Sequence, residues 1–161
     1  DFIAIQWGLD WEWSMRLSTK ARYAVRAMVD LALHGTEGTV TRDEIAERQA
    51  ISPLYLSHIL LKLGKADLVV STKGPGGGYQ LAKHPSEILV GDVVRAVGEP
   101  LDLVACVAPG GSNCPRVETC AAHLLWVRLS KTVRETLDSV TLEELTQQAR
   151  EVAALAGGPS Q

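Results

Sequence analysis

The sequence lacks any apolar run long enough to cross a membrane, although 46% of its 161 residues are apolar. A membrane-spanning helix needs about 20 consecutive, predominantly apolar residues. The sequence also lacks the apolar centre of a secretory signal peptide, and its three cysteines cannot all pair with one another. We therefore expect a cytoplasmic protein without a membrane partner, built as one compact domain or as one domain with an added arm.

Two common enzyme signatures are lacking as well. The glycine-rich stretch Thr72-Lys-Gly-Pro-Gly-Gly-Gly78 is not followed by Gly-Lys-Ser/Thr or by the start of a helix, as a nucleotide phosphate-binding loop would be. A cysteine nucleophile would need a base and a third group that orients the base. Only His123 lies near the cysteines, and no acidic residue is suitably placed. We expect no enzymatic activity and no small-molecule substrate.

Positive charge is scarce overall, since 19 acidic residues outnumber 16 basic ones and the net charge is −3. The distribution is uneven. Residues 15–84 contain ten Lys or Arg and six Asp or Glu, whereas residues 85–161 contain six and ten. Only the first of these two segments is therefore expected to contact the phosphate groups of a nucleic acid.

The two ends of the sequence differ from the rest. Residues 1–14 contain three of the four tryptophans and no basic residue, and the sequence from Met15 onward looks like a natural start. We interpret residues 1–14 as a non-native or disordered extension. We also expect the short tail of residues 157–161 to be disordered.

Residues 18–49 carry the signals of two helices. Ser18 is a good N-cap for the first helix, and Gly35 is a good C-terminal stop. Thr41 and Glu44 have the spacing of a capping box, which begins a short second helix.

A third helix is predicted after a tight turn. Ser52 is a suitable N-cap, and Pro53 stands at the first helical position, where its absent N–H costs nothing. Its apolar stripe consists of Leu56, Ile59, Leu60 and Leu63. Its outer face consists of Tyr55, Ser57, His58, Lys62 and Lys65. Two short helices of this kind are typical of a DNA-binding helix-turn-helix, with a plain helical hairpin as the alternative.

Two short strands, 68–71 and 78–82, are predicted next, with the glycine-rich stretch between them as a hairpin tip. A backbone without bulky side chains can approach a phosphate group closely or enter a minor groove. A helix-turn-helix followed by a β-hairpin is a winged helix, so we predict a mainly α fold with a small β-hairpin. The residues expected to contact DNA are Arg16, Ser52, Tyr55, Ser57, His58, Lys62, Lys73, Gly74, Gly76 and Gly77.

All three cysteines lie in one stretch that ends in a histidine. Cys106, Cys114, Cys120 and His123 follow the spacing C-x7-C-x5-C-x2-H. Thiolate and imidazole bind zinc and iron–sulfur clusters well, and calcium or magnesium poorly. Glycine, proline, serine and asparagine between the first two cysteines predict a loop that can wrap around a metal. The spacing alone leaves zinc and an iron–sulfur cluster open, with ordinary buried thiols as the third interpretation.

The sequence on either side of the cysteines predicts helices. Valines from Val90 to Val97 have helical spacing. A long helix is predicted from Cys120 to about Val140, and a second capping box at Thr141 begins a final helix. A small domain cannot easily bury a helix as apolar as the long one, so we interpret its apolar line as a dimer interface. This line consists of Leu125, Leu129, Val133 and Leu137.

The sequence from Met15 to about Leu145 resembles the IscR-type iron–sulfur regulators, which are bacterial winged-helix transcription regulators of the Rrf family. The matching runs, besides the cysteines and histidine, are Met15-Arg-Leu-Ser-Thr-Lys-Ala-Arg-Tyr-Ala-Val-Arg-Ala-Met28, Glu44-Ile-Ala-Glu-Arg-Gln49, Gly74-Pro-Gly-Gly-Gly-Tyr79 and Gly91-Asp-Val-Val94. The resemblance implies a homodimer that binds palindromic, double-stranded promoter DNA and carries one cluster per subunit. Residues 15–84 would form the winged helix-turn-helix domain, and residues 85–156 the cluster-binding loop and dimerisation helices.

The resemblance also implies a ligand set. A histidine shortly after the third cysteine is similar to the regulators of cluster biogenesis that hold a 2Fe–2S cluster, so Cys106, Cys114, Cys120 and His123 carry over as its ligands. The alternatives are a nitric-oxide-sensing repressor of the NsrR type, a 4Fe–4S cluster, and a structural zinc site. The sequence departs from the family pattern at Ala50, where relatives often have glycine, and in a slightly longer loop between the first two cysteines.

Overall fold

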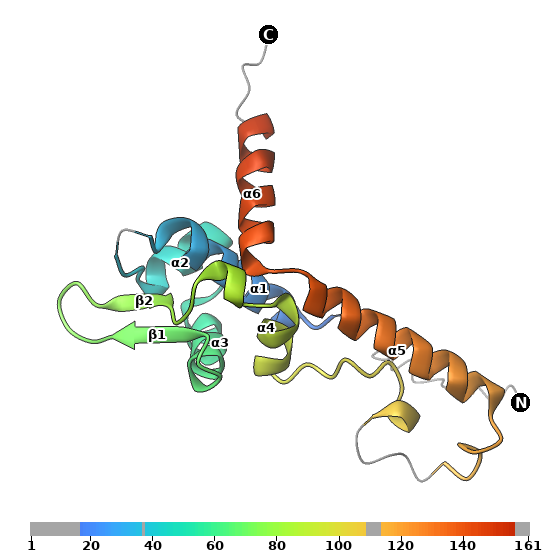
Figure 1. The fold of residues 1–161 in the computed structure, drawn as a ribbon. Coiled ribbons are helices and arrows are strands. Elements are labelled where there is room, and N and C mark those ends of the chain that lie inside the picture. The colour runs from blue at the N-terminus through green and yellow to red at the C-terminus, as the bar shows by residue number, and fades with distance from the viewer. Residues whose placement is uncertain (1–16, 37, 109–113, 157–161) are drawn as a thin grey trace, which may run out of the picture.

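The structure, a computed structural model, describes residues 17–36, 38–108 and 114–156. The helices and strands in chain order are α1 (Thr19–His34), α2 (Arg42–Gln49), α3 (Pro53–Lys65), β1 (Val69–Thr72), β2 (Gly78–Leu81), the 3-10 helix η1 (Pro85–Glu87), α4 (Val90–Ala96), the 3-10 helix η2 (Ala105–Val107), α5 (Ala121–Ser139) and α6 (Leu142–Ala156). α1 to α4 form the body of the molecule, from which the hairpin, α5 and α6 project (Figure 1). The expected N-terminal extension, Arg16 and the expected C-terminal tail lie outside the described residues.

The local signals for α1 and α2 are confirmed. Ser18 Oγ accepts a hydrogen bond from the backbone amide three residues later at 3.2 Å, and Gly35 N–H donates to the carbonyl of Leu31 at 2.8 Å. In the capping box of α2, Thr41 Oγ1 accepts from the Glu44 amide at 3.3 Å, and Glu44 Oε2 accepts from the Thr41 amide at 2.7 Å. Hydrogen bonds from the hydroxyl and the amide of Thr41 lower the pKa of Glu44.

The core lies where α1, α2, α3 and α4 meet. α1 contacts the other three helices and also α6 and β2. The predicted apolar stripe of α3 is confirmed, because all four of its side chains are at most 1% exposed. The largest fully buried side chains are Met28, Leu31, Ile45, Leu56, Ile59, Leu60, Leu63, Ile88, Leu142, Val93, Val94 and Val97.

The hairpin is a two-stranded antiparallel sheet in which Val69 lies opposite Leu81. The first and the last residue of each strand lie within one residue of the predicted limits. Val40, just before α2, pairs with Tyr79 through two backbone hydrogen bonds of 2.9 and 2.7 Å. This pairing ties the hairpin to the start of the helix-turn-helix.

α5 begins and ends within one residue of its predicted limits, but its apolar line divides in two. Leu137 packs against the core of the same chain, whereas Leu125 and Leu129 are 49% and 37% exposed. Among the described residues of α5, Ser130 is the one that is buried. None of the described helices is both long and apolar enough to cross a lipid bilayer.

The junction between α5 and α6 is held against the segment before α4. The amide of Leu142 donates to the carbonyl of Ile88 at 2.8 Å. The capping box predicted here forms its first hydrogen bond, from the Glu144 amide to Thr141 Oγ1 at 3.2 Å. One oxygen of the Glu144 carboxylate accepts from Gln148 Nε2 at 3.4 Å, one helical turn further on.

Candidate functional site

The turn between α2 and α3 places the start of α3 at the surface. Ala50 adopts the left-handed conformation, with φ 51° and ψ 48°, in which glycine has no steric penalty and alanine has one. Ser52 Oγ then accepts a hydrogen bond from the Tyr55 amide at 3.2 Å, and Pro53 occupies the first helical position. The predicted turn and cap are confirmed.

A buried carboxylate on α1 holds the end of α2. Asp30 is fully buried. Its carboxylate accepts from Arg48, with Nη2 2.7 Å from Oδ1 and Nε 3.0 Å from Oδ2, and from Gln49 Nε2 at 2.8 Å. The hydrogen bonds to Asp30 raise the pKa of Arg48. Because burying an unpaired charge is costly, these bonds fix α1 against the last turn of α2.

Aromatic contacts join α1 to α3. The guanidinium of Arg26 lies 5.4 Å from the ring centroid of Tyr23 and its Nε donates to Gln49 Oε1 at 3.1 Å. The ring of Tyr23 meets that of Tyr55 edge-on, with centroids 6.0 Å apart and an interplanar angle of 82°. Tyr55 is therefore half-buried and packed against the core, rather than on the outer face of α3 as expected.

Two further polar residues of α3 form hydrogen bonds within the chain. The hydroxyl of Ser57 donates to the Pro53 carbonyl at 2.9 Å and accepts from Arg42 Nη1 at 3.4 Å. Nζ of Lys62 donates to the carbonyl of Val97 at 3.1 Å, which links α3 to the end of α4. Both residues were expected to face DNA, and the structure shows that their polar atoms already have partners.

The side chains that extend outward from α3 include two leucines. Leu54 is 72% exposed and Leu61 is 59% exposed, and His58 between them is exposed as well. Their i, i+4 and i+7 spacing places all three on one face of the helix. Leu54 and Leu61 are absent from the residues that the sequence predicts to contact DNA. Both lie outside the apolar stripe of α3, and this position is the sequence signal that they are exposed.

The hairpin tip is exposed, as predicted, and its conformation requires glycine. Gly74 and Gly76 have φ values of 98° and 73°, and a Cβ on Gly77 would overlap with a backbone carbonyl oxygen of β1. Thr39 Oγ1 donates to the Gly76 carbonyl at 2.8 Å and ties the tip to the segment before α2. The tip presents the exposed Lys73.

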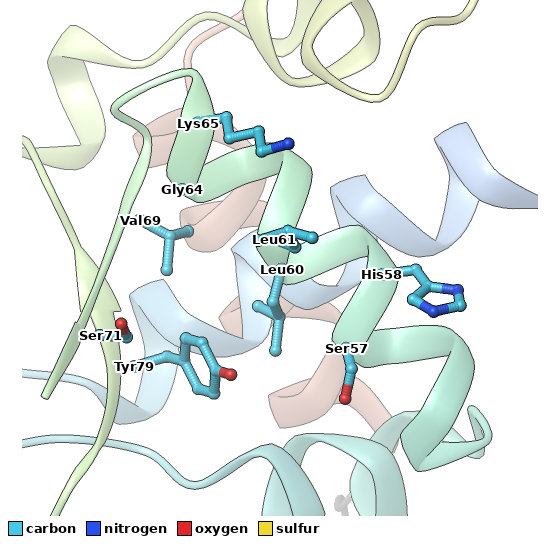
Figure 2. Close-up of a pocket in the computed structure, with 9 residues that line it drawn as sticks. All are labelled: Ser57, His58, Leu60, Leu61, Gly64, Lys65, Val69, Ser71 and Tyr79. Carbon is cyan, nitrogen blue, oxygen red and sulfur yellow. The ribbon is translucent and has the colours of Figure 1, made fainter. Parts of the chain in front are cut away.

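A groove of about 520 Å³ lies between α3 and the hairpin. Figure 2 shows Leu60 and Leu61 on the α3 side, and Ser71 and Tyr79 on the hairpin side. The residues that line the groove are Ser57, His58, Leu60, Leu61, Gly64, Lys65, Val69, Ser71 and Tyr79. The outer face of α3 and the hairpin are thus two sides of one concave surface.

The cysteine segment connects α4 to α5. Cys106 lies in η2, Cys120 is the N-cap of α5, and His123 lies in the first turn of α5. Cys106, Cys120 and His123 are half-buried, and Cys114 is exposed. Within the described residues, which exclude 109–113, no three His, Cys, Asp or Glu side chains lie close enough to hold a metal ion. The structure therefore does not bring the four predicted ligands together.

The donors nevertheless fit a metal ion or cluster by their chemistry. His123 Nδ1 is buried and has no hydrogen-bond partner. Such atoms are rare in native structures and need an explanation, such as a bound ion. Coordination of a metal by Nδ1 would remove this penalty. The other three donors are thiols, which together with imidazole suit zinc or an iron–sulfur cluster.

Polar contacts join the segment before Cys106 to α5. Ser130 Oγ accepts a hydrogen bond from the amide of Leu103 at 3.2 Å, and Ser130 is fully buried. One turn further along α5, Arg134 pairs with Asp102. The segment that leads into the cysteine loop is therefore attached to the middle of α5.

α5 is in turn attached to α4. Nη2 of Arg95 lies 2.8 Å from Oδ1 of Asp138 and 2.8 Å from Oδ1 of Asp92. Hydrogen bonds to Asp138, which have the larger effect, and to Asp92 raise the pKa of Arg95. A Cβ on Gly91 would overlap with the carboxylate of Asp138, so a larger residue at this position would displace the side chain that pairs with Arg95. Together with the hydrogen bond between α3 and α4, these contacts form a path from the cysteine segment to α3.

Comparison with known proteins gives consistent matches over most of the chain. Residues 17–148 match the model of the Rrf2 family, described as an iron-dependent transcriptional regulator. The transcriptional regulator IscR of Pectobacterium atrosepticum is 47% identical over 131 residues, which cover 81% of this chain and 79% of that protein. IscR of Photorhabdus laumondii is 46% identical over 143 residues, covering 89% and 85%.

Solved structures share the fold. IscR of T. potens superposes with a TM-score of 0.71 at 36% identity, covering 92% of this chain and 94% of that one. CymR, the global cysteine regulator of B. subtilis, superposes with a TM-score of 0.68 at 34% identity, covering 84% and 98%. The predicted fold class, a winged helix-turn-helix with a long C-terminal helix, is confirmed.

Proposed function

Because the chain belongs to the Rrf2 family of transcriptional regulators and is of the IscR type, we propose that it is a cluster-sensing regulator of promoter DNA. The family is not enzymatic, in agreement with the sequence prediction. In this proposal the protein acts in the cytoplasm as a homodimer. An iron–sulfur cluster held by Cys106, Cys114, Cys120 and His123 controls how the dimer binds double-stranded DNA.

The observation that carries the cluster assignment is the buried, unpaired Nδ1 of His123, which lies one turn from Cys120. Three thiolates and a neutral imidazole around an oxidised 2Fe–2S core would have a total charge of about −1, which a half-buried site can hold. When bound, the cluster supplies a redox-active group whose histidine ligand is more easily lost than a thiolate. A 4Fe–4S cluster and zinc remain the alternatives for the same donors.

The polar contacts around α5 supply a route from the cluster to DNA. Ligation would bring Cys106 and Cys114 to the start of α5 and so restrain the loop. Any change in the position of α5 is passed to α4 through Arg95 and Asp138, and from α4 to α3 through Lys62. Two arrangements of these packed helices would form a two-state switch between cluster-loaded and cluster-free protein.

Support for the homodimer comes from the exposed apolar surface of α5. Leu124, Leu125, Val127 and Leu129 are 37–66% exposed on a helix that projects from the body (Figure 1). A soluble monomer rarely leaves a contiguous apolar surface of this kind uncovered. A second copy of the same helix would cover it and would place two α3 helices on one DNA duplex.

The proposed function is tested by the composition of the protein purified without oxygen. We expect a coloured protein with visible absorption bands that contains iron and acid-labile sulfide in equal amounts. It should bind a bacterial promoter duplex as a dimer. Stoichiometric zinc without sulfide in freshly purified protein would contradict the cluster assignment, and a monomer without affinity for any duplex would contradict the regulatory function.

Replacing Lys73 with alanine is expected to weaken DNA binding without changing sequence preference. The exposed lysine at the hairpin tip is a phosphate contact in the proposed complex. Loss of one phosphate contact lowers the slope of log affinity against log salt concentration by about 1. The slope can be measured by fluorescence anisotropy in a salt series. Lys83→Ala, another exposed lysine, which follows β2 rather than the tip, is the control and should leave the slope unchanged.

A further inference from the structure

The polar side chains at the start of α3 have partners inside the protein. The hydroxyl of Ser52 caps its own helix, and the ring of Tyr55 packs against Tyr23. The hydroxyl of Ser57 donates to Pro53 and accepts from Arg42. A side chain that must break such contacts to reach a base contributes less to recognition than one that is already exposed.

Leu54 is a large apolar side chain in the first turn of α3, and 72% of its surface is exposed. In helix-turn-helix proteins the N-terminal residues of the second helix contact base edges in the major groove. Leucine has no hydrogen-bonding group. The apolar group that a base pair presents in the major groove is the 5-methyl group of thymine.

We propose that Leu54 determines sequence specificity by packing against the 5-methyl group of a thymine in each half-site. This inference rests on the proposed DNA binding and specifies part of what α3 reads. Leu54 contacts the methyl group from the first turn, and the exposed His58, one turn later on the same face, faces the neighbouring base pair.

The charge of the segment that contains Leu54 favours DNA over a protein partner. The exposed leucines of α5 belong to a segment with an excess of acidic residues, whereas residues 15–84 carry ten basic and six acidic residues. The guanidinium of Arg42 reaches Ser57 on the same helix as Leu54, and Lys65 lines the groove beside the hairpin. An exposed leucine in a segment with an excess of basic residues complements a methyl group that lies between phosphate backbones.

The test uses the full chain in its cluster-loaded and cluster-free forms. A bound sequence is first selected from a duplex library with a randomised centre. Each thymine of the selected half-site is then replaced with deoxyuridine, which removes only the methyl group, and affinities are compared by fluorescence anisotropy. We expect one thymine per half-site at which the replacement weakens binding about fourfold, which corresponds to burial of one methyl group at about 0.8 kcal/mol.

The Leu54→Ala protein should bind the thymine and uracil duplexes equally at that position. Leu61→Ala removes another exposed leucine of α3 and should keep the fourfold difference. Because both side chains are exposed, both variants should fold, which thermal melting verifies. The role of Leu54 would be overturned if no thymine of the selected half-site showed this effect. It would also be overturned if the effect persisted in the Leu54→Ala protein. Failure of both protein forms to select any sequence would instead overturn the proposed DNA binding, and this inference with it.

Discussion

Replacing Arg48 with alanine is expected to lower the free energy of unfolding by about 3 kcal/mol, because the variant leaves the carboxylate of Asp30 buried without its charged partner. Asp30 is fully buried, and Arg48 makes the charged hydrogen bonds to it from the last turn of α2. Gln49 would remain as a neutral partner, which is why the expected loss lies at the lower end for a broken buried pair. Urea denaturation followed by circular dichroism measures the change.

Two further variants separate the effect of leaving a charge buried from the effect of losing an ion pair. Arg42 forms an ion pair of 2.8 Å with Asp43, and both side chains are well exposed, so Arg42→Ala should cost about 0–1 kcal/mol. The double variant Arg48→Ala/Asp30→Asn should be more stable than Arg48→Ala alone, because it no longer buries an unpaired charge. If Arg48→Ala were as mild as Arg42→Ala, Asp30 would not depend on Arg48 in the folded protein.

Exchange of His123 for cysteine is expected to change the cluster without removing it. A fourth thiolate adds negative charge to the cluster and so favours its oxidised form, which lowers the reduction potential. The His123→Cys protein should therefore keep its visible bands, titrate at a lower potential and lose iron more slowly in air. His123→Ala should retain the cluster poorly, and Cys120→Ser should lose most of its iron and sulfide. Redox titration and the decay of the visible bands measure these effects.

A matched control places a new cysteine outside the cysteine segment. His84 is exposed and is the N-cap of η1, so His84→Cys should leave the potential and the rate of iron loss unchanged. An unchanged potential and loss rate in His123→Cys would show that His123 is not a ligand. The fourth donor would then have to come from the partner subunit or from α1.

Features that depend on neighbours within one helical turn could be predicted from the sequence. The N-caps at Ser18, Thr41 and Ser52 are such features, because the hydroxyl and the amide that it accepts from are three residues apart. The apolar stripe of α3 is another, since helical periodicity alone separates Leu56 from its exposed neighbour Leu54. Together with the two short strands around the glycine-rich stretch, these signals predict the winged-helix fold.

Features that depend on partners far along the chain could not be predicted. Tyr55 looks like an outer-face residue until Tyr23 is brought next to it, and Lys62 looks like a phosphate contact until Val97 lies within reach. Asp30 gives no sequence signal of burial, because its partners are 18 and 19 residues away. The ligand set remains a prediction for a related reason, since it depends on how a long loop closes around a metal.

The attachment of α5 to α4 near one end gives the helix the geometry of a lever. α5 has 19 residues, so at 1.5 Å per residue it is about 28 Å long. Asp138, which contacts α4, lies near its C-terminal end, and Cys120 lies at its N-terminal end. A displacement of about 2 Å at Cys120 would tilt the axis of α5 by about 4° around the contact with α4. The helix would thereby convert a translation near the cysteines into a rotation beside the helix that we propose to read DNA.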